Sequence, residues 1–366
     1  MDSRVKNLAD ILVNYSIKVK PGDWVVVTAD VQAIPLFNEV VEKVLLAGGH
    51  PSLMLQDDVS EAISLQFANE AQLKWIDPLS QLINEKADAV IFLGAPNNTR
   101  AYSAVPAEKQ KIRSASRQKL TKVFAQRAMR KEVRWVLTQF PCPALAQEAN
   151  MSLPEFENFV YKATFADQAD PVGAWQQLHD EQQRFIDWIA GKDQVQVKGP
   201  HVDLSLSING RTFINADGES NMPSGEIFTG PVEESVNGWI KFAYPAIAYG
   251  REVEGVELEF KAGKVVSAKA TKNEEFLLTM LETDAGARYL GEFAIGTNYG
   301  IQQFTKSILY DEKIGGTIHV ALGNGYPETG SVNESGIHWD MICDMHEDSE
   351  ILVDGELFYK NGAFQI

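Results

Sequence analysis

The sequence contains little cysteine and no long apolar run. Its 366 residues include two cysteines, Cys142 and Cys343, which lie far apart and in no metal-binding or redox spacing. Two isolated thiols exclude a disulfide framework and are typical of a reducing compartment. No segment approaches the ~18 apolar residues of a membrane span, and the N-terminus lacks the apolar core of a signal peptide. We therefore expect a cytoplasmic protein with no membrane partner.

Positive charge is also scarce. The chain has 33 Lys and Arg against 50 Asp and Glu, which gives a formal net charge of -17. Such a charge repels phosphate backbones and anionic membrane surfaces. The one basic concentration, residues 109–134, has no interleaved aromatic residues and is typical of a solvated helix face. We expect no nucleic-acid partner.

Several well-known catalytic motifs are missing. Gly-x-Gly-x-x-Gly after a strand, Gly-x-x-x-x-Gly-Lys-Ser/Thr and Gly-x-Ser-x-Gly do not occur. The nearest imitation is GNGYPETG at residues 323–330, whose third glycine comes too late for a dinucleotide-binding loop. Both cysteines lie in apolar surroundings without a basic neighbour, so a core position is favoured over nucleophilic catalysis.

The apolar pattern divides the chain into two halves. The first half alternates strand and helix patterns, with strands expected at 23–29, 50–55, 87–95 and 134–140 and helices at 36–49 and 107–131. This alternation predicts a parallel sheet covered by helices. The second half has alternating segments joined by hairpin turns and one helix at 274–286, which predicts a mainly β, α+β structure. A chain of this length exceeds one ordinary core, so we expect an N-terminal α/β domain at 1–195 and a β-rich domain at 196–366.

Candidate ligands gather in the second half. His338 and Asp340 stand two apart in HWDMI, so a strand would point both to one face, with Ile337, Trp339 and Met341 packing as core on the other. A further histidine, His319, lies in the apolar run GGTIHVALG. One strand histidine is more often a core residue than a ligand, but two in neighbouring segments favour a metal site. Imidazole and carboxylate are ligands of Zn, Co or Mn, and a two-metal hydrolytic site needs further carboxylates.

Two glutamates have apolar sequence neighbours in the same half. Glu226 lies in SGEIFTGP and Glu292 in LGEFAIG. Burying an unpaired carboxylate costs several kcal/mol, so a buried glutamate there requires a cation. By spacing alone, each glutamate could equally lie at a strand end and face solvent.

These segments resemble a known family. GEIFTGP, GEFAIGTN, IHVALGNGYPETG and HWDMI, in this order, are similar to the M29 family of thermophilic-type metallo-aminopeptidases, and the opening NLADILVNYSIKVKPGDWVVV is similar to the family's first helix and strand. The resemblance implies that the β-rich domain is catalytic and holds two divalent ions, Zn or Co, with Mn or Mg as alternatives. The metal ligands it implies are Glu226, Glu292, His319, His338 and Asp340.

The same resemblance implies an activity. It predicts hydrolysis of the N-terminal residue from peptides by a water that two metal ions activate, with Glu292 as the base and Tyr326 as a donor to the oxyanion. It also predicts a homodimer. Two other readings stay open at this point: another two-metal hydrolase, such as an amidase or phosphoesterase, and a non-enzymatic small-ligand binding protein with a structural metal site.

Overall fold

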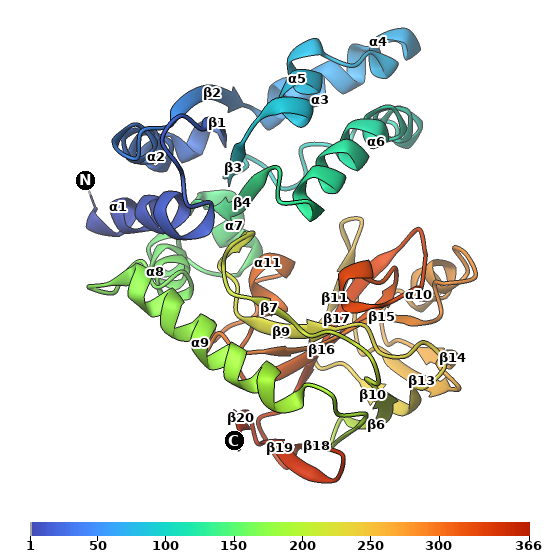
Figure 1. The fold of residues 1–366 in the computed structure, drawn as a ribbon. Coiled ribbons are helices and arrows are strands. Elements are labelled where there is room, and N and C mark those ends of the chain that lie inside the picture. Colours follow the sequence, from blue (N-terminus) through green and yellow to red (C-terminus); the bar gives the residue numbers. More distant parts are fainter. Residues whose placement is uncertain (1) are drawn as a thin grey trace. The chain divides into compact units, whose positions relative to one another are not determined.

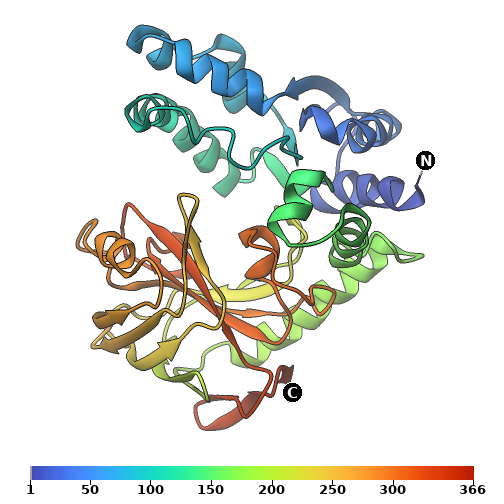
Figure 2. The ribbon, with the colours of Figure 1, turned by 180° about the vertical axis from the view of Figure 1, so that it is seen from behind.

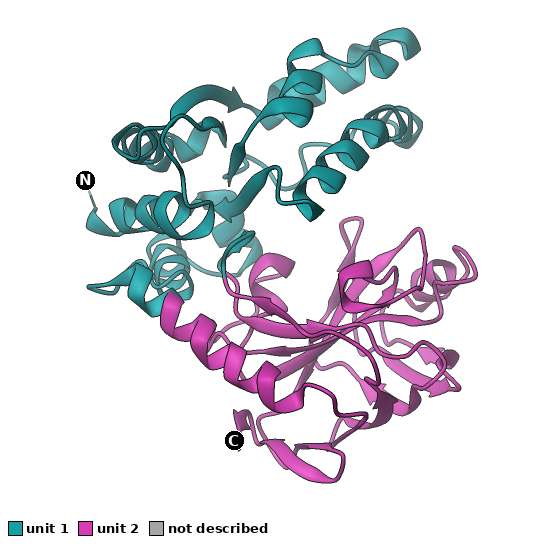
Figure 3. Cartoon of the chain, in the orientation of Figure 1, with its two compact units in different colours: residues 1–175, 218–223 teal, residues 176–217, 224–366 magenta. Residues whose placement is uncertain are grey.

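The structure is a computed structural model that describes residues 2–366. Its contacts divide the chain into two compact units, coloured separately in Figure 3: residues 1–175 with 218–223, and residues 176–217 with 224–366. Among the described residues, none of the helices combines the length and apolar character needed to cross a bilayer. Each unit has its own sheet or sheets and its own core.

The first unit is built on a parallel sheet with strand order β2-β1-β3-β4-β8. Its strands are β1 (Trp24–Asp30), β2 (His50–Gln56), β3 (Ala89–Gly94), β4 (Arg134–Gln139) and β8 (Asn221–Met222). All four neighbouring pairs run parallel. The run Val25 to Val27 in β1 is buried on both sides of the sheet, as expected of a covered parallel strand. The predicted α/β architecture is confirmed.

Helices lie on both sides of this sheet (Figures 1 and 2). They are α1 (Ser3–Asp10), the π-helix η1 (Ile11–Ser16), the 3-10 helix η2 (Val31–Ala33), α2 (Ile34–Leu46), α3 (Asp58–Phe67), α4 (Glu70–Lys74), α5 (Pro78–Lys86), α6 (Ala107–Met129), α7 (Pro143–Glu148) and α8 (Leu153–Ala163). Ile83 of α5 and Phe124 of α6 pack with Val26 and Val90 on one face of the sheet. Only Leu120 of α6 is buried, as expected of the solvated basic helix.

The second unit contains two large antiparallel sheets. The eight-stranded sheet has the order β14-β13-β10-β6-β5-β18-β19-β20. Its strands are β5 (Gln194–Gly199), β6 (Val202–Ser207), β10 (Asn237–Lys241), β13 (Glu257–Lys261), β14 (Lys264–Lys269), β18 (Glu350–Val353), β19 (Glu356–Lys360) and β20 (Ala363–Phe364). A two-stranded hairpin, β11 (Ala246–Ala248) with β12 (Arg251–Val253), forms no hydrogen-bonded ladder with either sheet, although β11 lies against β17.

The five-stranded sheet has the order β17-β16-β15-β9-β7 and shares one apolar core with the eight-stranded sheet. Its strands are β7 (Ile214–Ala216), β9 (Glu226–Thr229), β15 (Leu290–Gly296), β16 (Thr317–Gly323) and β17 (His338–Asp344). Its connections contain α10 (Glu274–Leu281), α11 (Ile308–Asp311) and the 3-10 helix η3 (Pro327–Thr329). One face of this sheet enters the core, so the other face is available for polar side chains.

Two predicted boundaries differ from the structure. The division between the units falls inside α9 (Pro171–Ile189) rather than at residue 195, because Phe185 and Ile189 of that helix pack into the core of the second unit. Helix α10 ends at Leu281 and not at residue 286, because the Asp284 carboxylate accepts hydrogen bonds from the backbone N–H groups of residues 286 and 287. Such a local side-chain bond competes with continuation of the helix.

Candidate metal centre

Strand β17 presents two polar side chains on one face. Because successive side chains alternate, His338 and Asp340 point one way while Trp339 and Met341 point the other. Ile337, just before the strand, is 5% exposed, Trp339 is 3% exposed and Met341 is 1% exposed, and all three belong to the shared core. The prediction that these flanking residues pack as core is confirmed.

Glu292 reaches the same face of the sheet through a β-bulge. The register of β15 against β16 shifts between Leu290 and Glu292, so Leu290 stays in the core while Glu292 lies opposite Ala321. A bulge adds one residue to a strand and redirects the side chains that follow. A Cβ atom on Gly291 would lie 2.2 Å from the carbonyl oxygen of Asn324, so only glycine fits at this point.

Strands β16 and β9 add His319 and Glu226. His319 lies opposite Ala294 of β15, and Glu226 lies opposite Gly296 at the end of the same strand. The His319 side chain is 1% exposed and that of Glu226 is 8% exposed. All five side chains predicted as ligands therefore lie on neighbouring strands of one sheet, on the face that points away from the core.

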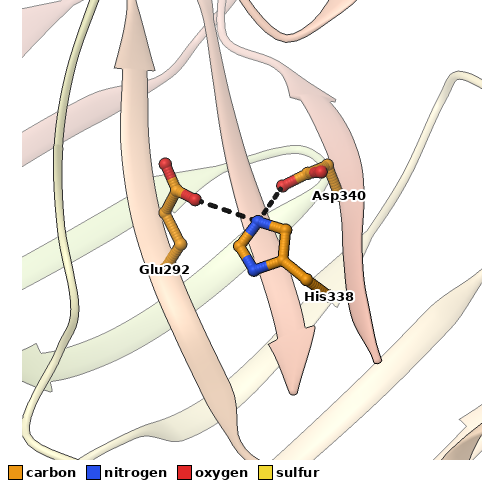
Figure 4. Close-up of side chains that lie close together, drawn as sticks. All are labelled: Glu292, His338 and Asp340. Carbon is orange, nitrogen blue, oxygen red and sulfur yellow. Dashed lines mark ion pairs between the residues drawn. The ribbon is translucent and has the colours of Figure 1, made fainter. Parts of the chain in front are cut away.

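The first group of converging side chains consists of Glu292, His338 and Asp340. The Nε2 atom of His338 lies 3.3 Å from Oε2 of Glu292 and 3.3 Å from Oδ1 of Asp340. One ligand atom from each residue lies within 4.8 Å of the other two. In Figure 4 the imidazole stands between the two carboxylates, one from β15 and one from β17. This is an arrangement that a single cation can bind.

The second group contains a residue that sequence reasoning missed. Ligand atoms of Glu312, His319 and Asp340 also lie within 4.8 Å of one another, so Asp340 belongs to both groups. The Nε2 atom of His319 lies 3.4 Å from Glu292 and 3.7 Å from Glu226. Glu312 follows α11 in a turn without strand periodicity. The charged run at residues 311–313, shortly before an apolar strand, is the sequence signal that could have identified it.

Both imidazoles are oriented by backbone carbonyl groups. The Nδ1 atom of His319 lies 2.9 Å from the carbonyl oxygen of Glu312, and Nδ1 of His338 lies 2.8 Å from that of Asn324. A carbonyl oxygen only accepts, so Nδ1 carries the proton in each ring and donates it. In the neutral tautomer, Nε2 is then the basic nitrogen that faces the carboxylates, which is the usual way of preparing a metal-binding histidine.

Burial and close contact shift the pKa values of the ionisable groups in the cluster. Burial raises the pKa of Glu226 from 4.5 to about 8. Burial opposes protonation of the two histidines, but hydrogen bonds to the carboxylates outweigh it and raise the pKa of His319 to about 10 and that of His338 to about 11. For Glu292 and Asp340, burial is outweighed by hydrogen bonds from these histidines, so both pKa values lie below the ordinary range.

Two buried carboxylate oxygens in the cluster lie near histidine nitrogens but accept no hydrogen bond of favourable geometry from the described residues. They are Oε2 of Glu226 and Oδ1 of Asp340. Buried polar atoms are nearly always satisfied, so each exception requires an explanation. Carboxylate oxygens beside basic imidazole nitrogens form a donor set suited to Zn, Co or Mn. A divalent cation would satisfy both oxygens, so the residues fit a metal site.

Tyr326 lies at the edge of the cluster. Its ring centroid is 5.1 Å from that of His338 in an edge-on arrangement and 5.3 Å from that of Phe228. Burial and the nearby carboxylates raise the pKa of its hydroxyl, so it stays protonated and able to donate. The four other histidines lie outside the cluster: His179 pairs with Asp217, His346 pairs with Asp344, His50 opens β2, and His201 directly precedes β6.

Comparisons with known proteins point to one family. The profile of the family described as "Thermophilic metalloprotease (M29)" matches residues 1–364. The chain is 26% identical over 411 residues to "Aminopeptidase 2" of Geobacillus stearothermophilus, covering 100% of this chain and 99% of that protein. It is 26% identical over 400 residues to "Aminopeptidase T" of Thermus thermophilus, covering 98% and 95% respectively. The solved structure of wild-type AmpT from Thermus thermophilus has the same fold, with a TM-score of 0.86, 22% identity and 99% of both chains covered.

Proposed function

The chain belongs to the M29 family of thermophilic metalloproteases, and from this premise we infer that it is a metal-dependent aminopeptidase. The resemblance predicted from four sequence segments is confirmed by the match over almost the whole chain. Its full-length relatives from Geobacillus stearothermophilus and Thermus thermophilus are both named aminopeptidases. A metalloprotease requires a divalent cation, so the activity depends on the face of the sheet that fits one.

We propose that this face binds two divalent ions, Zn or Co, with Mn or Mg as alternatives. One observation carries the proposal: two groups of potential ligands share a single carboxylate, that of Asp340. A shared carboxylate is the usual bridge between paired ions. Glu292 and His338 would hold one ion and His319 and Glu226 the other, with Glu312 as an additional ligand of the second position.

The side chains of the cluster divide the chemistry between them. When bound, the divalent ions would anchor the free α-amine, polarise the scissile carbonyl and lower the pKa of a water. Glu292 faces both histidines and is the proposed base, which takes the proton of the attacking water and passes it to the leaving amine. Tyr326 keeps its proton and would donate a hydrogen bond to the developing oxyanion. The backbone carbonyl groups of Glu312 and Asn324 keep the two imidazole rings in a fixed orientation.

The proposed substrates are peptides with a free N-terminus, and the proposed setting is the cytoplasm. Two free, buried cysteines support a reducing compartment.

We also propose a homodimer. Exposed apolar side chains on the first unit support it: Phe67 is 76% exposed and Trp75 is 60% exposed, and contiguous apolar surface often marks an interface. Light scattering of the purified protein would measure the assembly, and a monomer at all concentrations would contradict it.

Hydrolysis of aminoacyl 4-nitroanilides and short peptides tests the function. We expect release of the N-terminal residue, loss of activity with EDTA and recovery with Zn or Co. N-acetylated peptides are the matched control, because blocking the amine leaves the scissile bond unchanged. Cleavage of blocked and free peptides at equal rates would overturn the exopeptidase assignment and favour another two-metal hydrolase, such as an amidase.

Residue substitutions test the site separately. We expect Glu226→Gln and His338→Ala to abolish hydrolysis and to lower the metal content, while the circular dichroism spectrum stays nearly unchanged. Wild-type turnover in either variant would contradict the ligand assignment. A fully folded wild-type protein that holds no divalent metal after purification with added Zn would instead favour a non-enzymatic binding protein.

A further inference from the structure

One lysine lies inside the candidate metal centre. Among the lysines and arginines of residues 2–366, only Lys313 is buried, with 0% of its side chain exposed. It follows Glu312 in the turn that leads from α11 into β16. An ammonium group loses much of its hydration on burial and is retained only where nearby charges compensate it. The position of Lys313 is therefore set by its carboxylate partners.

These partners belong to one side of the cluster. Nζ of Lys313 forms an ion pair with Oε1 of Glu312 and lies 3.7 Å from Oε1 of Glu226. Both carboxylates border His319, and burial of the ammonium is outweighed by them, so the pKa of Lys313 is raised. The ion pairs of Glu292 and His338, on the other side, do not include Lys313. Asp340, which both groups share, also interacts electrostatically with the ammonium. The two potential metal positions therefore differ in their unshared ligands: the ammonium pairs with Glu226 and Glu312 beside His319, and with neither Glu292 nor His338.

We propose that Lys313 is an internal counter-ion that makes the two metal positions unequal; this rests on the proposed function for the identity of the ligands. The position of Glu292, His338 and Asp340 binds a divalent ion first. At the position of His319, an incoming ion competes with the ammonium for Glu226 and Glu312 and binds more weakly. Lys313 is a positioning residue, because it holds these two carboxylates in place while that position is empty.

Charge counting gives the direction of the effect. Metal binding requires ionised carboxylates and neutral imidazoles. In that state, the four carboxylates of the cluster and the ammonium leave three negative charges to attract the first ion. After one divalent ion has bound, one negative charge remains to attract the second. Without Lys313, two would remain, so the second ion would bind more tightly. At the same time, the metal-free protein would lose the partner of two buried carboxylates and would become less stable.

Stepwise titration of the full-length, metal-free protein with Co²⁺ tests the proposal. Calorimetry and the absorption spectrum of bound cobalt measure each binding step. We expect the wild type to bind two ions in steps at least about tenfold apart in affinity, since a unit charge at this distance is worth at least that much. Lys313→Met keeps the side-chain length without the charge. It should tighten the second step by about tenfold or more. It should tighten the first step by less, because Nζ pairs with Glu226 and Glu312 and not with Glu292 or His338. It should also lower the Tm of the metal-free form more than that of the loaded form. Lys313→Arg should restore the wild-type separation.

Several outcomes would overturn the proposal. They are two equal steps in the wild type, an unchanged ratio of steps in Lys313→Met, or an equal loss of Tm in the metal-free and loaded forms. If Lys313→Met does not fold, Glu312→Gln provides the second test. It should weaken only the second step, and weakening of the first step instead would refute the assignment.

Peptide hydrolysis by the wild type is measured in parallel and keeps the two proposals apart. Unequal binding steps without hydrolysis would contradict the aminopeptidase and leave the role of Lys313 standing. Hydrolysis together with two equal metal-binding steps would support the aminopeptidase and contradict the role of Lys313.

Discussion

The two faces of the β17-β16-β15-β9-β7 sheet are made by alternate residues of the same strands, yet they have opposite chemistry. Ile318 and Val320 of β16 are fully buried in an apolar core, while His319 between them lies among four carboxylates, those of Glu226, Glu292, Glu312 and Asp340. Trp339 likewise separates His338 from Asp340. The apolar face holds the backbone in one place, and the polar face uses that rigidity to keep charged groups close together. Stability and function should therefore respond separately to changes on the two faces.

The largest expected effect on activity comes from the polar face. Glu292→Gln keeps the shape of the side chain but removes its charge and its ability to take a proton. We expect turnover to fall by roughly 10²–10⁴-fold, as for loss of a general base, with the circular dichroism spectrum unchanged. The matched control is Glu356→Gln, at a side chain that is 66% exposed and forms an ion pair with Lys192. Equal losses in both variants would break the distinction between the faces.

The largest expected effect on stability comes from the apolar face. Met341 is 1% exposed and is the next residue after Asp340. Met341→Ala should lower the free energy of unfolding by about 2–5 kcal/mol, because it leaves a cavity in the core. Urea unfolding measures this loss. Turnover per folded molecule, assayed well below the Tm, should stay within a few-fold of wild type, and a loss as large as that of Glu292→Gln would show that the two faces are not separable.

The polar face should also make stability depend on pH and metal together. The folded-state pKa of Glu226 is raised from 4.5 to about 8, and those of His319 and His338 from 6.5 to about 10 and about 11. A group with a raised pKa contributes stability below its unfolded pKa and loses that contribution as pH rises through the folded value. The metal-free protein should therefore become less stable between about pH 5 and pH 11. The lowered pKa values of Glu292 and Asp340 act at lower pH and leave this window unchanged.

A bound divalent ion replaces those protons, so the increase in stability that metal binding gives should become larger as the pH rises. Melting the protein with EDTA and with Zn at about pH 6 and about pH 8 measures it. We expect a larger rise in Tm on adding Zn at the higher pH, and hydrolysis should fall in acid as protons displace the metal. A rise in Tm that shrinks toward higher pH would contradict the assignment of these residues as ligands.

The smallest effect is expected from a histidine of the same unit that lies outside the polar face. His346 pairs with Asp344 and its side chain is 49% exposed. His346→Ala should change stability by no more than about 0.5 kcal/mol, as is usual for surface positions, and should leave kcat/KM unchanged. Loss of activity in this variant would show that the functional site extends beyond the two groups of ligands that share Asp340.

Period-two reasoning within one strand was reliable because it depends on local backbone geometry alone. It placed His338 and Asp340 on one face and their apolar neighbours on the other, as the structure has them. The parallel sheet of the first unit was predicted from a different signal, the alternation of strand and helix patterns along the chain, and its strands and helices lie close to their predicted positions. For Glu226 and Glu292, sequence spacing alone left the solvent-facing alternative open. Only the paired strands show that both are buried beside His319.

The amino-acid sequence by itself determined the order of the elements, the apolar and polar faces of each strand, and the segments that identify the family. The tertiary structure alone decided which groups meet. A bulge at Gly291 turns Glu292 toward the histidines, and a turn after α11 returns Glu312 and Lys313 to a sheet whose pattern they do not share. The physical reason is that alternation follows from local stereochemistry, whereas a buried charge is stable only beside partners that distant parts of the chain supply.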